Sequence, residues 1–363
     1  MPADGAGFFP KVPSHQQKLS NRSGWGDERG RGKRHEEALD ETHLFSRAWR
    51  LTPPARMEGE RRVLRKRKAL DKDVRRMEYI SSFLSIASES SRIIVFTGSG
   101  ISASAGLSTF TSKGGLYERA MKRFKVKDGM KLFCNSHYRR HPKDCLALMG
   151  EIYDEATAAS PTEAHLAIGR LETRGRLVRH YTMNIDGLHQ LVRGATTWTG
   201  VRDCPGKTVS LHGCCRELLC TNASCDAPKV STMTQAHARA FKGRKDVRCS
   251  ACSEPTRPKI MLYDDADSEL ITPDLVMEVM DEDISKCDLV LWVGISFQQS
   301  ASLEYFRNVQ RVIKELGRGE EVTQAIINPD EDSWFNAISG MNNMDNTKVI
   351  PVVCDANTIL SEL

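Results

Sequence analysis

Short runs of aliphatic and β-branched residues recur along the chain from about residue 90, and longer segments with helical spacing of apolar positions separate them. The first run, residues 92–97, reads Arg-Ile-Ile-Val-Phe-Thr and leads straight into turn residues. Such a run is typical of a buried strand. Strands that alternate with helices predict an α/β fold with a parallel, doubly wound sheet. The predicted strands are residues 92–97, 177–182, 208–211, 259–263, 288–295, 323–328 and 348–353.

The first 75 residues differ from the rest, because they are rich in Gly, Pro, Ser, Arg and Glu and show no sustained apolar period. Such a segment buries too little apolar surface to offset its chain entropy, so we expect a disordered, basic tail over residues 1–75. A helical pattern begins at about Val74. Residues 61–68, RRVLRKRK, form either a solvated charge run at the start of that helix or a nuclear import signal or nucleic-acid contact. We expect a nuclear protein, with the cytoplasm as the alternative.

The overall composition is that of a globular protein, with 40% hydrophobic and 27% charged residues among 363 and a net charge of +5. No apolar stretch approaches the roughly 20 residues that a membrane helix needs, so we expect no membrane association. The N-terminus lacks the apolar core of a secretory signal. Eleven cysteines in a reducing compartment indicate metal binding rather than disulfides.

Two close cysteine pairs predict a zinc site. Cys220 and Cys225 are followed, after a gap of 23 residues, by Cys249 and Cys252. Four thiolates in this spacing are typical of a tetrahedral structural zinc, and they leave no position open for a reactive water. The alternative is a set of free buried thiols, and residues 214–215, two further cysteines, could compete as ligands.

Polar residues follow three of the predicted strands. Residues 98–100, Gly-Ser-Gly, follow the first strand, Asn184 and Asp186 follow the second, and His212 follows the third. The carboxyl ends of parallel strands share one crevice in which ligands bind, glycines admit a phosphate, and a histidine can act as a base near neutral pH. The alternatives are a tight turn, an Asx turn with a helix cap, and a structural histidine. A dehydrogenase is disfavoured because the third glycine of its fingerprint comes too late, at Gly106.

Taken together, these motifs and the four cysteines resemble the sirtuins, the NAD-dependent protein lysine deacylases. The resemblance covers roughly residues 76–360, and the layout is most similar to the nuclear, histone-directed branch. The matching pieces are GSGISASAG (98–106), Phe110, GGLY (114–117), YTMNIDGL (181–188), LHG (211–213), RPKIMLY (257–263), VGIS (293–296), IIN (326–328) and CD (354–355).

The resemblance implies a catalytic domain over residues 76–363 in two lobes. A large Rossmann-like lobe would comprise residues 76–112, 165–213 and 257–363. A smaller lobe would combine a helical insertion, residues 113–164, with a four-cysteine zinc module, residues 214–256. NAD and an acetylated lysine of a protein, with histones as the expected substrate, would enter the cleft between the lobes, and the products would be nicotinamide, free lysine and O-acetyl-ADP-ribose.

The family pattern also implies roles for individual residues. His212 would be the general base, with Asn184 and Asp186 beside the nicotinamide and its ribose. Residues 260–263 would pair with the substrate backbone as an added strand. Further cofactor contacts are implied for Gly98, Ser99, Gly100, Ser102, Phe110, Gly294, Ser296, Asn328, Cys354 and Asp355, and zinc ligation for Cys220, Cys225, Cys249 and Cys252.

Several positions depart from the family pattern on the cofactor side. Thr109 and Thr111 stand where the family has an aspartate and an arginine, Met183 replaces a glutamine, and Ile295 replaces a threonine. Residues 264–265, Asp-Asp, replace Gly-Glu. Each lost hydrogen bond to a charged group costs on the order of 1.5–3 kcal/mol. The alternative function is therefore a weakened sirtuin-fold module that binds acyl-lysine or a nucleotide without turnover.

Overall fold

The protein, seen in a computed structural model, is described over residues 55–110, 114–226, 228, 230–264, 271–273, 275–339 and 348–363. The chain divides into two units, residues 1–63 and 64–363. The larger unit contains every strand and nearly every helix of the described residues. Among those residues, no helix combines the length and the apolar composition that crossing a bilayer requires.

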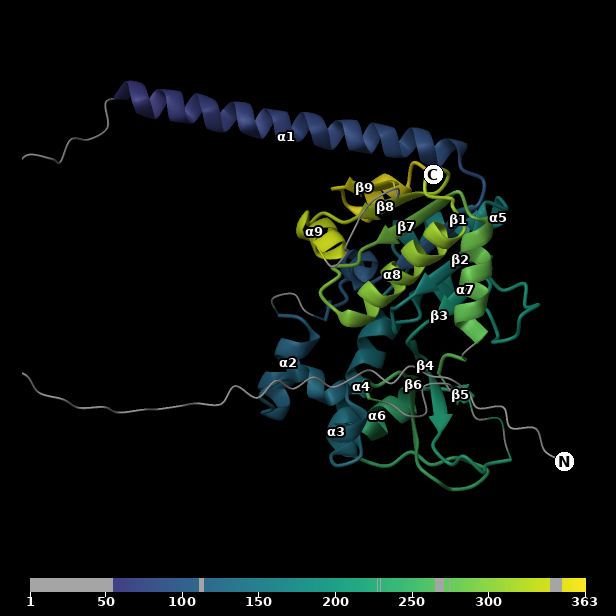
Figure 1. Ribbon diagram of the computed structural model, residues 1–363. Helices are drawn as coiled ribbons and strands as arrows, with labels where there is room; N and C mark the ends of the chain where they lie inside the picture. The colour runs from purple at the N-terminus through teal and green to yellow at the C-terminus, as the bar shows by residue number, and fades with distance from the viewer. Residues whose placement is uncertain are drawn as a thin grey trace, which may run out of the picture. The chain divides into compact units, whose positions relative to one another are not determined.

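A six-stranded parallel sheet forms the centre of the larger unit (Figure 1), in the order β3-β2-β1-β7-β8-β9. From β1 the chain continues to β2 and β3 on one side, and β7, β8 and β9 extend the sheet on the other side of β1. The strand order therefore reverses between β1 and β7, and ligands bind at such a point in parallel sheets. The predicted fold class is confirmed. The strands are β1 (Ile93–Thr97), β2 (Leu177–Thr182), β3 (Thr208–Ser210), β7 (Leu289–Val293), β8 (Thr323–Ile327) and β9 (Lys348–Val352).

Helices cover both faces of this sheet, which explains why its central strands are apolar along their whole length. Phe96 and Trp292 of the sheet pack against α7 and α8 on one face. Val95 and Leu291 pack against α1, α5 and α10 on the other. Helix α9 also lies beside the sheet. The six helices are α1 (Ala55–Glu89), α5 (Glu163–Thr173), α7 (Leu275–Lys286), α8 (Ser300–Glu315), α9 (Asp332–Ser339) and α10 (Ala356–Leu360).

A smaller lobe has its own core and its own antiparallel sheet, in the order β5-β4-β6. Met149 and Phe241 from its helices pack on Leu218 and Ile260 from its strands. The sheet consists of β4 (Gly213–Cys220), β5 (Val230–Thr232) and β6 (Thr256–Ile260), and the helices are α2 (Leu116–Phe124), α3 (Asn135–Tyr138), α4 (Pro142–Ala158) and α6 (Gln235–Lys242).

The structure differs from the predicted elements in the smaller sheet, where β4 and β5 were not predicted and β6 is shifted, and at the start of α1. Strand β6 covers Thr256–Ile260 rather than residues 259–263, because it pairs with β4, which the sequence did not predict, and only a single bridge joins Tyr263 to Cys134. Helix α1 begins at Ala55, inside the tail expected to be disordered. Residues 1–54 lie outside the described residues, so the rest of that prediction stays a prediction.

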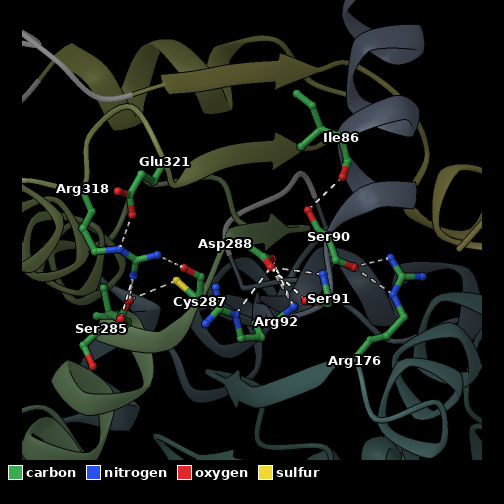
Figure 2. Close-up of polar contacts among 11 residues, drawn as sticks. Ile86, Ser90, Ser91, Arg92, Arg176, Ser285, Cys287, Asp288, Arg318 and Glu321 are labelled. Atoms are coloured by element: carbon green, nitrogen blue, oxygen red, sulfur yellow. Dashed lines mark hydrogen bonds and ion pairs between the residues drawn. The ribbon is translucent and has the colours of Figure 1, made fainter.

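Polar contacts at the amino ends of the strands join the segment after α1 to the residues before β2, β7 and β8 (Figure 2). The Asp288 carboxylate accepts hydrogen bonds from the backbone N–H groups of Ser91 and Arg92, each at 3.1 Å. The Arg176 guanidinium donates to the carbonyl oxygen of Ser90, and Arg318 donates to that of Cys287 at 2.7 Å. These bonds satisfy backbone groups at the edge of the sheet opposite to the strand carboxyl ends.

A buried ion pair ties β2 to α7. Arg179 Nε lies 2.8 Å from Asp283 Oδ2, and the Tyr181 hydroxyl donates to the same oxygen at 2.7 Å. Arg179 also donates to the Gly206 carbonyl oxygen at 2.6 Å. All the partners are buried, so the carboxylate neutralises a guanidinium that has little access to water.

We therefore predict that Asp283→Ala lowers the free energy of unfolding by about 3–5 kcal/mol, because the change leaves the buried Arg179 charge unpaired. Urea unfolding would measure the loss. Asp281→Ala is the matched control, since Asp281 pairs with Arg311 at 2.9 Å on the surface, where such pairs contribute about 0–1 kcal/mol. Equal losses for the two variants would contradict the prediction.

Candidate active site

The ends of β1 and β2 meet through three buried side chains. Ser102, in the 3-10 turn after β1, donates a hydrogen bond to Asp186 Oδ2 at 2.7 Å. Asn184 Nδ2 donates to the Ser102 hydroxyl oxygen at 3.2 Å. Asp186 Oδ1 accepts from the backbone N–H of Leu188 at 2.9 Å, so the Asx turn is also present. The predicted convergence of these two strand ends is confirmed. Asp186 both closes the turn after β2 and bonds to Ser102 after β1.

His212 follows β3 and joins the same group of residues. Its Nδ1 donates to the Met183 carbonyl oxygen at 3.1 Å, which leaves Nε2 as the acceptor. Burial lowers the pKa of His212 to about 4. The imidazole is therefore neutral near pH 7 and available as a base.

Glycines at the ends of β1 and β7 allow the two turns to lie in contact. A Cβ atom on Gly98 would meet the Gly294 carbonyl oxygen at 2.8 Å, and one on Gly100 would meet Gly294 Cα at 2.7 Å. Gly294 itself has φ +63°, in the left-handed region. The N–H groups of Gly98 and Gly100 donate to the carbonyl oxygens of Val293 and Gly294. The two glycines thus pack the turns together, and their contact with a cofactor stays a prediction.

Two neighbouring cavities open at these strand ends, of about 110 and 330 Å³. The smaller cavity brings together several of the predicted cofactor residues, and the larger one has mostly apolar and aromatic walls. Both are lined by Phe110, Tyr117, Met183, His212, Tyr263 and Ala301. The smaller one adds Gly98, Ser99, Asn184, Gly294, Ile295, Ser296, Gln299 and Ser302.

The predicted residues from β8 and β9 lie further out. Asn328 Nδ2 donates to the Ile295 carbonyl oxygen at 3.1 Å, which ties the end of β8 to the turn after β7. The Asp355 carboxylate caps α10 by accepting from the backbone N–H of Asn357 at 2.9 Å. The N–H of Cys354 donates to the Val352 carbonyl oxygen. None of these three side chains lines either of the two cavities, so their role toward a cofactor stays a prediction.

Two of the departures from the family pattern have apolar roles here. Met183 and Ile295 are buried within the core on the α7 and α8 face of the sheet, and both also line the smaller cavity. Asp264 accepts a hydrogen bond from the backbone N–H of Asn135 at 2.7 Å. The backbone of Thr109 accepts from the N–H of Leu116. Residues 111 and 265 lie outside the described residues.

Several cavity residues were missing from the predicted site, among them Tyr117 and Gln299. The Tyr117 hydroxyl lies 3.1 Å from that of Tyr263, which in turn donates to Gln299 Oε1 at 3.4 Å. Burial and the neighbouring Tyr263 hydroxyl raise the pKa of Tyr117, so this phenol stays protonated. These groups connect the insertion, the segment after β6 and the start of α8. Tyr117 lies within the GGLY motif, whereas nothing in the sequence marks Gln299.

The four predicted zinc ligands gather at one point of the smaller lobe. Their sulfur atoms all lie within 4.8 Å of one another, with Cys220 and Cys252 at 3.6 Å and Cys225 and Cys249 at 3.9 Å. Backbone N–H groups of residues 251–252 lower the pKa of the Cys249 thiol to about 6, which favours a thiolate ligand.

These distances fit a tetrahedral zinc ion. Four sulfurs at the usual bond length of about 2.3 Å lie about 3.8 Å apart from one another. A disulfide would need about 2.05 Å. Neither Cys214 nor Cys215, both in β4, joins the cluster. The Cys215 thiol donates to the Asp186 carbonyl oxygen, and the Cys214 thiol donates to Gln190 Oε1.

The comparisons with known proteins identify the family. A model of the Sir2 family matches residues 98–300, which is more than half of the chain. The chain belongs to the Sir2 family. The predicted resemblance is confirmed, and the matched region contains the strand-end residues and all four cysteines of the cluster.

Curated relatives and solved structures agree with this sirtuin assignment. The NAD-dependent protein deacetylase of Thermodesulfovibrio yellowstonii is 26% identical over 62% of this chain and 78% of the relative. The NAD-dependent histone deacetylase sirtuin-1 of Drosophila melanogaster is 28% identical, but the match spans 59% of this chain and only 26% of that protein. A solved complex of a Sir2 homologue with NAD is 19% identical, with a TM-score of 0.55 over 78% of this chain and 91% of that one, and shows the same fold.

We predict that this sirtuin binds one zinc ion per chain through the cysteine cluster. Cys220→Ser and Cys249→Ser should each abolish stoichiometric zinc, because three thiolates hold the ion far more weakly than four. Cys204→Ser, in a loop away from the cluster, is the control. Elemental analysis of purified protein gives the stoichiometry, and full zinc content in both cluster variants would disprove the site.

Proposed function

We propose that the chain is an NAD-dependent protein lysine deacetylase. The observation that carries this proposal is the oriented His212 on the wall of a cavity that Asn184, Gly98 and Ser99 also line. A positioned neutral base beside a glycine-lined turn is what such a reaction requires. The names of the bacterial and Drosophila relatives state this activity for those proteins.

The residues of the smaller cavity fit a dinucleotide. Gly98 and Gly294 line it without side chains that would narrow it, and Ser99 and Ser296 line it as well and carry hydroxyl groups. Asn184 adds a polar side chain from the end of β2, and Asp186 lies behind it, bonded to Ser102. When bound, NAD supplies an activated ribose carbon that accepts the acetyl oxygen as nicotinamide leaves.

His212 would take a proton from a ribose hydroxyl group. Its Nε2 is free to accept because Nδ1 donates to the Met183 carbonyl oxygen, which fixes the tautomer. The ring lies 6.3 Å from that of Tyr305, centroid to centroid. The imidazole is therefore oriented from two sides before any ligand binds, which lowers the cost of ordering it for the reaction.

The larger cavity suits the acetylated lysine. Its walls of Phe110, Phe133, Ile260 and Leu262 can enclose the methylene chain and the acetyl group. The N–H and carbonyl groups of Leu262 bond to nothing within the described residues. An extended substrate backbone could add to the chain at this point, as in other peptide sites built by strand addition.

We further propose that the substrates are nuclear proteins, histones among them. The name of the Drosophila relative states a histone substrate for that protein. The basic run at residues 61–68 supports nuclear import, and it also offers the part of the chain best suited to a direct contact with nucleic acid.

Binding without turnover is the second candidate function. Met183 and Ile295 favour it, because they place apolar side chains on the wall of the smaller cavity. Calorimetric titration with NAD and with ADP-ribose measures whether the site still holds the dinucleotide, and the turnover assay that follows separates the two functions.

We predict NAD-dependent release of nicotinamide from the zinc-loaded protein in the presence of an acetylated histone peptide. His212→Ala should lower the rate by about 10²–10⁴-fold, the usual contribution of a general base. His141→Ala, at an exposed histidine before α4, should leave the rate unchanged. Absence of release from folded, zinc-loaded wild-type protein would favour the binding module.

The depressed pKa of His212 also predicts the pH dependence. The histidine acts in its neutral form. Because burial lowers its pKa to about 4, the fall of kcat/KM on the acid side should be centred at a correspondingly low pH. The value at pH 5.5 should then stay close to that at pH 7.5, whereas an unshifted histidine with a pKa of about 6.5 would lose about tenfold. A limb centred near 6.5 would show that the base is solvated in the free enzyme.

A further inference from the structure

A groove of about 460 Å³ lies between α1 and the outer side of the sheet, away from the strand-end cavities. It shares no lining residue with either of them. Helix α1 forms one wall, and α9 with the end of β9 forms the other. The lining residues are Lys72, Arg75, Arg76 and Tyr79 from the first wall and Glu331, Trp334, Phe335, Pro351 and Val353 from the second.

The second wall is apolar and partly exposed. Phe335 is 55% exposed, and its ring lies 5.1 Å from that of Trp334. The indole Nε1 of Trp334 is buried and has no acceptor among the described residues. An exposed phenylalanine beside a second large aromatic side chain marks a surface that is stabilised by being covered.

The first wall is cationic. Lys72, Arg75, Arg76 and Tyr79 follow helical spacing and share one face of α1. Lys72 is paired with Glu331 at 2.7 Å. Arg75 and Arg76 are exposed and have no ion pair or hydrogen bond with any residue that the structure describes. Two positive charges therefore remain uncompensated beside the apolar wall.

The edge of the sheet beside the groove is unsuited to strand addition. Strand β9 is the outermost strand and pairs with β8 alone. Pro351 within it has no N–H group to donate, and proline on an edge strand blocks a continuous ladder. An occupant must therefore be held by side-chain contacts in the groove rather than by backbone pairing.

We propose that this groove docks an acidic peptide segment of a partner protein, with one aromatic or aliphatic anchor residue. The anchor covers the exposed Phe335 ring and the neighbouring Trp334 side chain. Carboxylates on either side of the anchor pair with Arg75 and Arg76. The groove is thereby a protein-docking surface distinct from the deacetylation cleft, and it does not depend on turnover there.

Fluorescence anisotropy on the full chain tests the proposal with three labelled peptides. The first carries one phenylalanine and one leucine among glutamates, the second has glutamine in place of every glutamate, and the third has alanine in place of the phenylalanine and the leucine. The first should bind at least about tenfold more tightly than the other two, since losing one charge-assisted contact, or the burial of one large apolar side chain, has about that effect.

Variants locate the binding. Arg75→Glu, Arg76→Glu and Phe335→Ser should each weaken the first peptide by about tenfold or more. Arg307→Glu, at an exposed arginine of α8, is the charge-matched control and should bind like the wild type. All these positions are exposed, so the variants should keep the melting temperature of the wild type.

Four results would overturn the proposal. The first is no binding by any of the peptides, and the second is binding that the groove variants leave unchanged. The third is a short DNA duplex that displaces the peptide and depends on the same residues, which would assign the groove to nucleic acid. Self-association of the wild type that Phe335→Ser abolishes would likewise replace the proposed partner with a second copy of the chain.

Discussion

The close approach of two glycine turns at the centre of the parallel sheet is the constraint on which the site depends. With side chains at Gly98, Gly100 or Gly294, the turns after β1 and β7 would move apart, because the atoms opposite lie within 3 Å of where a Cβ would stand. Their contact sets the position of the 3-10 turn that carries Ser102. That serine in turn orders Asn184 and Asp186 at the end of β2. The arrangement of Ser102, Asn184 and Asp186 thus follows from the packing of the two backbone turns.

Much of this arrangement could be predicted from the sequence, because it depends on signals that are local. The central strands β1 and β7 are short apolar runs with turn residues after them, and all six strands of the parallel sheet lie within two residues of the predicted bounds. The cysteine spacing indicated the metal cluster in the same way. Strand β4 was missed because its sequence, GCCRELLC, shows no alternation, and its pairing with β6 comes from tertiary contacts.

Other features could not be read from the sequence. Composition indicated disorder before residue 76, yet α1 extends back to Ala55, since Arg, Lys, Glu and Leu are good helix formers. Tyr117 and Gln299 are joined through Tyr263, far from both in the chain. The sequence also presented Met183 and Ile295 only as lost polar contacts. In the structure both side chains are part of the core beside the cavity. They therefore contribute packing to the stability of the fold where a polar side chain would contribute a hydrogen bond to the cofactor.

The hydrogen bond that orients His212 comes from the main chain of residue 183 rather than from its side chain. Every amino acid carries that carbonyl oxygen. The side chain at this position can therefore change, as the methionine illustrates, while the imidazole keeps its tautomer and its direction. Residue 183 therefore has two independent roles, because a substitution there alters the wall of the cofactor cavity without removing the carbonyl oxygen that orients His212.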